Sequence, residues 1–141
     1  MPDCKTHDII TMITAPIIGV SSYLVTNDIK YTIIITLLFI FASFMFNGDL
    51  DIPSRPFNRW WLFKMIWIPY QVMFTHRSIF THGLIIGTIV RILYLGIIPF
   101  SYLLFKGNLE VLLTIDIKLI ISILVGLELG SAIHTVSDYL F

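Results

Sequence analysis

Charged residues are scarce in this sequence, and neither sign of charge is in excess. Only 13% of the 141 residues are charged, and nine Lys and Arg balance nine Asp and Glu. A typical soluble domain has about a quarter of its residues charged, so this composition does not suit one. The balance of signs also argues against nucleic acid as a partner, because proteins that bind it carry an excess of positive charge.

The sequence has a single cysteine, Cys4, which excludes an internal disulfide. It also lacks the features of a cleaved signal peptide. Lys5 is the only basic residue before the first apolar stretch, and no small-residue cleavage site follows that stretch. We therefore expect the first apolar segment to be retained in the protein.

The sequence instead contains long runs of apolar residues. Hydrophobic residues make up 57% of the chain, and the mean hydropathy is +0.89. A helix of about 20 apolar residues crosses ~30 Å of hydrocarbon, because each residue adds ~1.5 Å. Four such crossings are predicted, at residues 9–27, 31–48, 83–105 and 117–134.

Residues 49–82 differ from these runs, because they combine prolines, basic residues and many aromatic rings. Pro53 and Pro56 forbid a continuous helix at the start of the segment. Trp and Tyr favour the headgroup layer of a membrane, since the ring is apolar while its N–H or O–H needs water. The segment contains Trp60, Trp61, Phe63, Trp67, Tyr70 and Phe74. We therefore predict a single all-α domain, an integral membrane bundle of about four transmembrane helices with an interfacial aromatic segment.

Four crossings would place both termini and residues 49–82 on one side of the membrane. The basic residues of that side are Lys5, Arg55, Arg59, Lys64 and Arg77, and those of the other side are Lys30, Lys106 and Lys118. The positive-inside rule therefore predicts that both termini are cytoplasmic. All four histidines fall on the same side, at helix ends or in the connecting loop, where a bundle could bring them together.

Two short motifs have the spacing of metal ligands. His134 and Asp138 are one helical turn apart, so they share a helix face and could bind one ion. Asp49 and Asp51 alternate in a predicted extended stretch braced by Pro53, so both carboxylates would point to the same side. Both patterns are also common by chance, and an isolated DxD is more often a solvated acidic turn.

The segment from His76 to His82 is more distinctive. Two histidines six residues apart do not share a helix face, but they could converge if the chain bends between them, with Thr81 as the N-cap of the third crossing. Arg77 would then bind a phosphate or carboxylate of a substrate through its planar fork of donors. Interfacial histidines beside a headgroup-binding arginine are an equally good interpretation of this spacing.

Three further positions complete the candidate site. His7 precedes the first crossing and adjoins Asp8, so one of the two could bind an ion while the other orients a ligand histidine. Arg91 and Glu128 lie deep inside predicted crossings, where charges usually face the interior and pair. We therefore predict an Arg91–Glu128 pair beneath the histidines, with separate hydration of each charge as the alternative.

Several short motifs occur together in this chain. They include Thr6-His7-Asp8, Gly48-Asp49-Leu50-Asp51-Ile52, Trp67-Ile68-Pro69-Tyr70-Gln71, His76-Arg77-Ser78, Thr81-His82-Gly83 and Gly126-Leu127-Glu128-Leu129-Gly130. With this set the chain resembles, over almost its whole length, uncharacterised membrane proteins of cyanobacteria that are known as predicted metal-binding proteins. It is more distantly similar to bacterial inner-membrane predicted metal-dependent hydrolases, which share an aspartate pair, an HR…H segment and an HxxxD ending.

The resemblance implies a metal site and a location. The implied ligands are His7, Asp49, Asp51, His76, His82, His134 and Asp138. The implied location is the plasma or thylakoid membrane of a cyanobacterium. Mixed His and Asp ligands without Cys suit one or two ions of Zn, Mn or Fe.

Two functions from different classes fit these observations. The first is a membrane-embedded metal-dependent hydrolase, in which Asp8 and Arg77 are the candidate catalytic residues and the substrate is a phospholipid or other anionic amphiphile. The alternative is a non-catalytic membrane subunit or assembly factor of a larger complex, for example a photosynthetic one. An ion transporter fits less well, because only Arg91 and Glu128 lie deep and no acidic relay crosses the membrane.

Overall fold

A computed structural model describes residues 4–140, and all regular structure within that range is helical. This confirms the predicted all-α class. The four long helices are α1 (Cys4–Thr26), α2 (Ile29–Met45), α6 (Ile86–Lys106) and α7 (Ile117–Leu140). Short helices join them, namely η1 (Gly48–Asp51), α3 (Arg55–Arg59), η2 (Trp61–Ile66), α4 (Trp67–Met73), α5 (Ile79–His82) and η3 (Leu109–Thr114).

Each predicted crossing corresponds to one long helix. Among residues 4–140, α1, α6 and α7 are long and apolar enough to cross a membrane. The helix α2 is also apolar but has only 17 residues, which gives it a length of ~25 Å. It ends three residues before the predicted boundary, because the chain leaves helical geometry at Phe46 and Asn47 caps η1.

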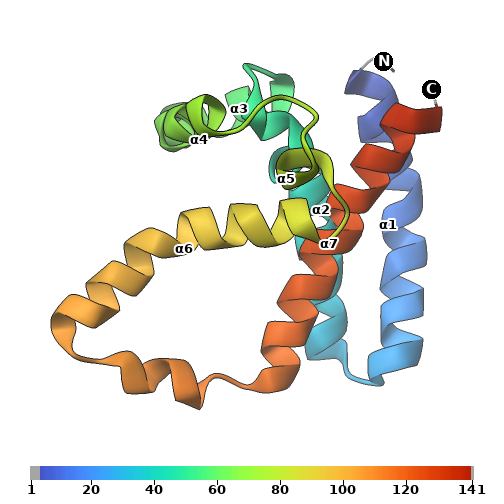
Figure 1. Cartoon of the computed structure of the whole chain (residues 1–141). Coiled ribbons are helices and arrows are strands. Elements are labelled where there is room, and N and C mark those ends of the chain that lie inside the picture. The colour runs from blue at the N-terminus through green and yellow to red at the C-terminus, as the bar shows by residue number, and fades with distance from the viewer. Residues whose placement is uncertain (1–3, 141) are drawn as a thin grey trace.

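The helices α1, α2 and α7 lie side by side and form a bundle (Figure 1), and α2 provides most of the contacts. Two glycines let α7 approach α2 closely. A Cβ added to Gly130 would lie 2.2 Å from the carbonyl oxygen of Phe39, and one added to Gly126 would lie 2.8 Å from that of Ile35. Small residues at this spacing permit backbones to touch, as they do in many membrane helix pairs.

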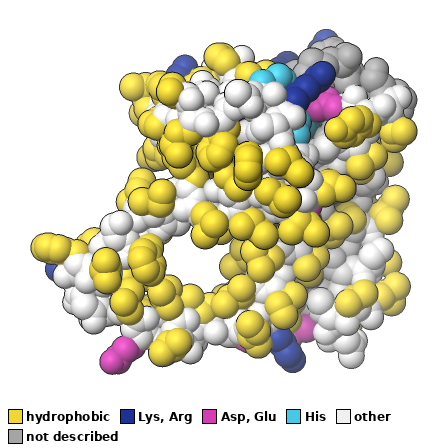
Figure 2. Space-filling view, in the orientation of Figure 1, with side chains coloured by type: hydrophobic (Ala, Val, Ile, Leu, Met, Phe, Trp, Pro, Cys, Tyr) yellow, Lys and Arg dark blue, Asp and Glu magenta, His cyan; other side chains and the backbone are white. Residues whose placement is uncertain are grey.

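The helix α6 leaves this bundle, contrary to the prediction of four packed helices. It contacts α7 near its own N-terminal end, runs outward, and returns through η3 to the start of α7 (Figure 1). We call α6 and η3, residues 86–114, the arm. Figure 2 shows an opening between the arm and the bundle. Beyond its first turns α6 has no close-packing glycine, since a Cβ on Gly96 would meet nothing within 4 Å.

The segment between α2 and α6 is broken into short helices, as its prolines predict. One half of it belongs to the core. Trp67 and Tyr70 are fully buried with their rings 5.4 Å apart, and Trp67 also stacks on Tyr94 of α6 at 5.8 Å. The other half faces outward, with Trp61 and Leu62 each 81% exposed. Burial of Trp67 and Tyr70 positions η1 and α5 beside the bundle. The interfacial location of the whole segment stays a prediction.

Candidate metal centre

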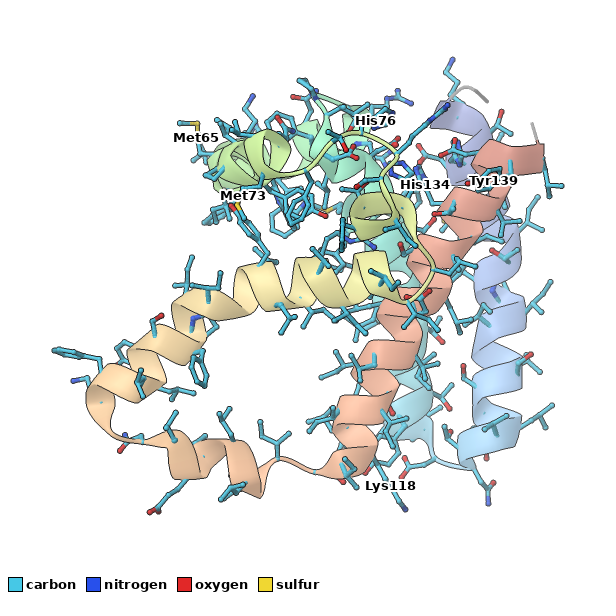
Figure 3. All side chains as sticks on the ribbon, in the orientation of Figure 1. Met65, Met73, His76, Lys118, His134 and Tyr139 are labelled. Carbon is cyan, nitrogen blue, oxygen red and sulfur yellow. The ribbon has the colours of Figure 1, made fainter. Side chains whose placement is uncertain are left out.

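Polar side chains from four segments meet at one end of the bundle. The segments are the first turns of α1, the helix η1, the stretch from His76 through α5, and the last turns of α7. Figure 3 marks this end by the labels of His76 and His134. All seven residues that the resemblance implies as ligands lie here in continuous contact. We call them the histidine–aspartate cluster: His7, Asp49, Asp51, His76, His82, His134 and Asp138.

Asp51 joins the two histidines of the His76–His82 segment. His76 Nδ1 lies 2.8 Å from Asp51 Oδ1, and His82 Nδ1 lies 3.6 Å from Asp51 Oδ2. The two rings are 5.1 Å apart, so the bend expected between them is present. Arg77 makes part of that bend with a positive φ of 59°, and its backbone N–H donates to Asp51 Oδ2 at 3.3 Å.

The bend does not use Thr81 as the N-cap of the long helix, so that prediction was wrong. Thr81 lies inside the extra helix α5, and α6 begins only at Ile86. The Thr81 hydroxyl is instead 3.0 Å from His82 Nδ1. Thr81 therefore helps to fix the orientation of the His82 ring, a role that orienting groups commonly have for ligand histidines.

His134 and His7 form the other part of the cluster. His134 Nε2 lies 3.3 Å from Asp49 Oδ2 and 3.7 Å from Asp138 Oδ2. His7 Nε2 lies 3.2 Å from Asp138 Oδ1, and the rings of His7 and His134 are 4.4 Å apart. His134 and Asp138 share one face of α7, in keeping with their spacing of one helical turn.

Asp49 lies between these two parts, in the 3₁₀ helix η1 that Asn47 caps, and not in the extended stretch that we predicted. Its Oδ1 is 3.4 Å from His82 Nε2, while its Oδ2 faces His134. Burial raises the pKa of the Asp49 carboxyl, but the polar contacts with His134 and His82 outweigh burial and hold this pKa well below its usual range. Asp49 is therefore ionised at neutral pH, which is the form that binds cations.

The residues of the cluster fit a divalent cation. His134 is only 4% exposed, its Nδ1 has no hydrogen-bond partner, and its Nε2 faces the carboxylates of Asp49 and Asp138 without hydrogen-bond geometry. Nδ1 of His7 is also buried without a partner. A buried polar atom left unsatisfied costs about 1–3 kcal/mol, and an ion between rings and carboxylates would supply the missing interaction. Imidazole and carboxylate donors without thiolate suit Zn, Mn or Fe.

The two predicted catalytic residues lie beside the cluster. Asp8 Oδ2 accepts from Arg59 Nη2 at 2.6 Å, and Arg59 also donates to the carbonyl oxygen of Phe44. We had expected Asp8 to orient a ligand histidine, but its side chain contacts Arg59 instead. Arg77 is exposed. It lines a pocket of about 110 Å³ together with His82, Thr135, Asp138 and Tyr139.

Arg91 and Glu128 do not form the predicted ion pair. Arg91 is fully buried and donates to the Thr81 carbonyl oxygen at 2.7 Å and to Ser131 Oγ at 2.6 Å. Glu128 accepts instead from the backbone N–H of Ile85, which has a positive φ of 65°. The Arg91 side chain therefore connects α5, next to His82, with α7 close to His134. Ser131 could have been noticed in the sequence, because it precedes His134 by three residues on a shared face.

Comparison with known proteins agrees with a metal centre. Over residues 2–141 the chain matches the family described as "Uncharacterized metal-binding protein (DUF2227)". It is also 38% identical over 58 residues to an uncharacterized protein of Aquifex aeolicus (strain VF5), and the aligned part is 40% of each chain. The chain thus spans about two fifths of the length of this curated relative. No solved structure matches the chain.

Proposed function

Because the chain belongs to this family of metal-binding proteins, we propose that it binds divalent metal in the histidine–aspartate cluster and uses it to hydrolyse an anionic amphiphile at a membrane surface. One observation carries the proposal. Residues far apart in the sequence converge on His134, whose buried Nε2 faces the carboxylates of Asp49 and Asp138. Buried imidazole and carboxylate groups that face one another in this way are stabilised when they coordinate a cation.

Membrane insertion is part of the proposal and rests on the surface of the long helices. Their outward faces are apolar, as Figure 2 shows for one side of the molecule. Val25 of α1 is 86% exposed and Phe105 of α6 87%, and Leu113 of the adjoining η3 is 87% exposed. A soluble monomer rarely exposes apolar patches of such extent, whereas lipid would cover them at no cost. The cluster lies at the end of the bundle, which would place it at the membrane surface on the side predicted to be cytoplasmic.

The residues around the cluster suit an anionic substrate. Arg77 lies on one side in the pocket of about 110 Å³, next to His82 and Asp138. Arg55 and Arg59 line a narrow cleft on another side, next to His7 and His134. A guanidinium binds phosphate or carboxylate through paired N–H donors, so each arginine could hold a headgroup near the cluster.

Each component has a distinct role in the proposed reaction. When bound, a divalent cation polarises the scissile group and lowers the pKa of water so that it attacks at neutral pH. Arg77 binds and orients the anionic group of the substrate. Asp8 positions Arg59 through their 2.6 Å contact. This role takes the place of the predicted one, in which Asp8 orients a ligand histidine. The exposed aromatic side chains at Trp61 and Phe63 would hold the apolar part of the substrate near the membrane surface.

Metal analysis of protein purified in detergent without chelator tests this function. We expect stoichiometric Zn, Mn or Fe, and its loss in the double variant His76→Ala, His134→Ala. Asp116→Ala is the matched control, because it removes a carboxylate at the opposite end of the bundle, where Asp116 contacts Tyr31. In Arg77→Ala the metal should remain while release of headgroup from an anionic lipid analogue falls. Protein that carries no metal would refute the proposal.

The arm favours a second candidate, a non-catalytic membrane subunit. Its side chains are exposed on several faces, including Ile97 (59%), Tyr102 (61%) and Leu104 (58%), and Figure 2 shows the opening beside it. A helix of a partner protein could pack there. This candidate requires stable association with a larger complex that survives in the double histidine variant, an outcome that the hydrolase does not require.

A further inference from the structure

We propose that the histidine–aspartate cluster holds two ions in unequal positions, with the Asp49 carboxylate bridging them. This inference rests on the proposed function and adds the number of ions and their order of affinity. Beside the bridging Asp49, the inner position is formed by His134 and Asp138, with His7 Nε2 3.2 Å from Asp138. The outer position is formed by Asp51, His76 and His82.

The number of ligands favours two ions over one. Seven side chains are in contact, and each can give at least one donor atom. A single Zn²⁺ in a structural site takes four ligands, and an octahedral ion such as Mn²⁺ takes six. One ion could therefore use at most six of the seven side chains, whereas two ions can use all seven.

Asp49 has the orientation of a bridging carboxylate. Its Oδ1 lies 3.4 Å from His82 Nε2 of the outer group, and its Oδ2 lies 3.3 Å from His134 Nε2 of the inner group. The two oxygens thus point toward different ligand groups. In two-metal hydrolytic sites the ions are ~3.5–4 Å apart, a separation that one carboxylate can span. Gly48 allows the His82 ring to lie against η1, because a Cβ at position 48 would be 2.8 Å from that ring.

The inner position is the more rigid, and none of its side chains is as exposed as His76 of the outer position. Its ligands come from α1 and α7, two helices of the bundle, and the side chains of His7 and His134 are 9% and 5% exposed. One turn after His7, Thr11 shares a hydrogen bond of 2.5 Å with Ser43, which ties α1 to α2. Ligands that are already held in place lose little conformational freedom on binding, so this ion should be held tightly.

The outer position is open to solvent. The side chain of His76 is 32% exposed, and it belongs to an irregular stretch between two short helices. The pocket that contains Arg77 borders both positions, through His82 of the outer one and Asp138 of the inner one. The outer ion should exchange faster than the inner ion, because its ligand His76 is exposed.

Counting of ions tests the inference. The whole chain in detergent is stripped with chelator, reloaded with Zn²⁺, dialysed and analysed for metal, with circular dichroism to verify that each variant is folded. We expect two ions per chain in the native protein and in Asp116→Ala, and one in His76→Ala. In case His76→Ala does not fold, His76→Gln keeps the polarity of the site and is expected to give the same count.

Electron paramagnetic resonance provides a second measurement. Protein loaded with Mn²⁺ should give the spectrum of a spin-coupled pair, and His76→Ala should give the six-line signal of an isolated ion. Graded chelation of the native protein should remove one ion before the other. A count of one ion in the native protein, or two in His76→Ala, would overturn the inference and leave the proposed metal binding intact. A count of zero would overturn both.

Discussion

The helices α6 and α7 have almost the same hydropathy but very different surroundings. Their most apolar stretches have mean hydropathies of 1.8 and 1.9, yet 11% of the residues are buried in α6 and 39% in α7. The difference teaches that hydropathy and packing are separate properties. Hydropathy reports the transfer of a helix into lipid, whereas packing between helices in lipid depends on small residues that allow close approach.

The residues responsible can be named. Gly126 and Gly130 place α7 against the backbone of α2, while Gly96 of α6 faces no neighbour. The contacts of α6 are concentrated near its start, where Arg91 reaches Thr81 and Ser131, and at Tyr94, which stacks on Trp67. The bundle thus holds α7 along its length, and it holds α6 by a few residues.

Replacement of Gly130 should have the largest effect. Gly130→Leu requires α7 to move away from α2, because its Cβ would lie 2.2 Å from the Phe39 carbonyl oxygen. We expect a loss of more than ~3 kcal/mol in unfolding free energy, with little folded protein recovered. Gly96→Ala is the matched control in α6 and should be neutral or slightly stabilising. Thermal unfolding in detergent measures both, and equal effects would remove the distinction between the two helices.

Removal of the Trp67 ring should release α6. Trp67 is fully buried against Tyr70 and Tyr94, so Trp67→Ala should destabilise the protein by about 3–5 kcal/mol. Trp61 is 81% exposed, and Trp61→Ala should leave unfolding in detergent nearly unchanged. Proteolysis of the arm should become faster in the Trp67 variant and should not in the Trp61 variant. A protected arm in Trp67→Ala would show that other contacts hold α6.

Loss of the Arg91 guanidinium should affect both helices at once. Arg91→Met keeps the aliphatic volume but leaves the Thr81 carbonyl and Ser131 hydroxyl without their donor. We expect a loss of about 2–4 kcal/mol. Zn²⁺ affinity should also fall, because Thr81 and Ser131 adjoin the ligand segments. Unchanged Zn²⁺ affinity in a destabilised variant would limit Arg91 to a structural role. Glu128→Gln is a control that should retain Zn²⁺ affinity, since Glu128 contacts Ile85 and not Arg91.

Metal removal should distinguish the two helices by their dynamics. Chelation should increase amide hydrogen exchange in the last turns of α7, which carry His134 and Asp138, and leave the outer half of α6 unchanged. Saturation at a hundredfold excess over Kd adds about 2.7 kcal/mol to stability. This gain should decrease on acidification, because ligand groups must lose their protons to bind metal. Equal exchange changes in α6 and α7 would contradict the localisation of the site.

The sequence predicts the helices and the members of the cluster better than the way they are arranged. Apolar runs of fixed length indicate helices, and the spacing of His134 and Asp138 places both on one face. Arrangement depends on contacts that leave no local signal. In α6 the sequence does contain a small residue, Gly96, but no neighbour lies within 4 Å of a Cβ built there, and hydropathy does not measure such packing.

The polar contacts show the same limit. Charge matching suggested Glu128 as the partner of Arg91, but a backbone carbonyl and neutral hydroxyls satisfy the guanidinium instead. Asp8 pairs with Arg59, a partner on a different helix about fifty positions away, so adjacency to His7 was misleading. The helix α5 is only four residues long, and such short helices have weak sequence signals.

The contact between His7 and Asp138 has a consequence for the order of biogenesis. These residues belong to the first and last helices described, so the inner position does not exist until α7 has been synthesised and has reached its place beside α2. A nascent chain that has inserted only α1 and α2 presents His7 alone. Ion binding would therefore be a late step of maturation, and the bound ion would link α1 to α7.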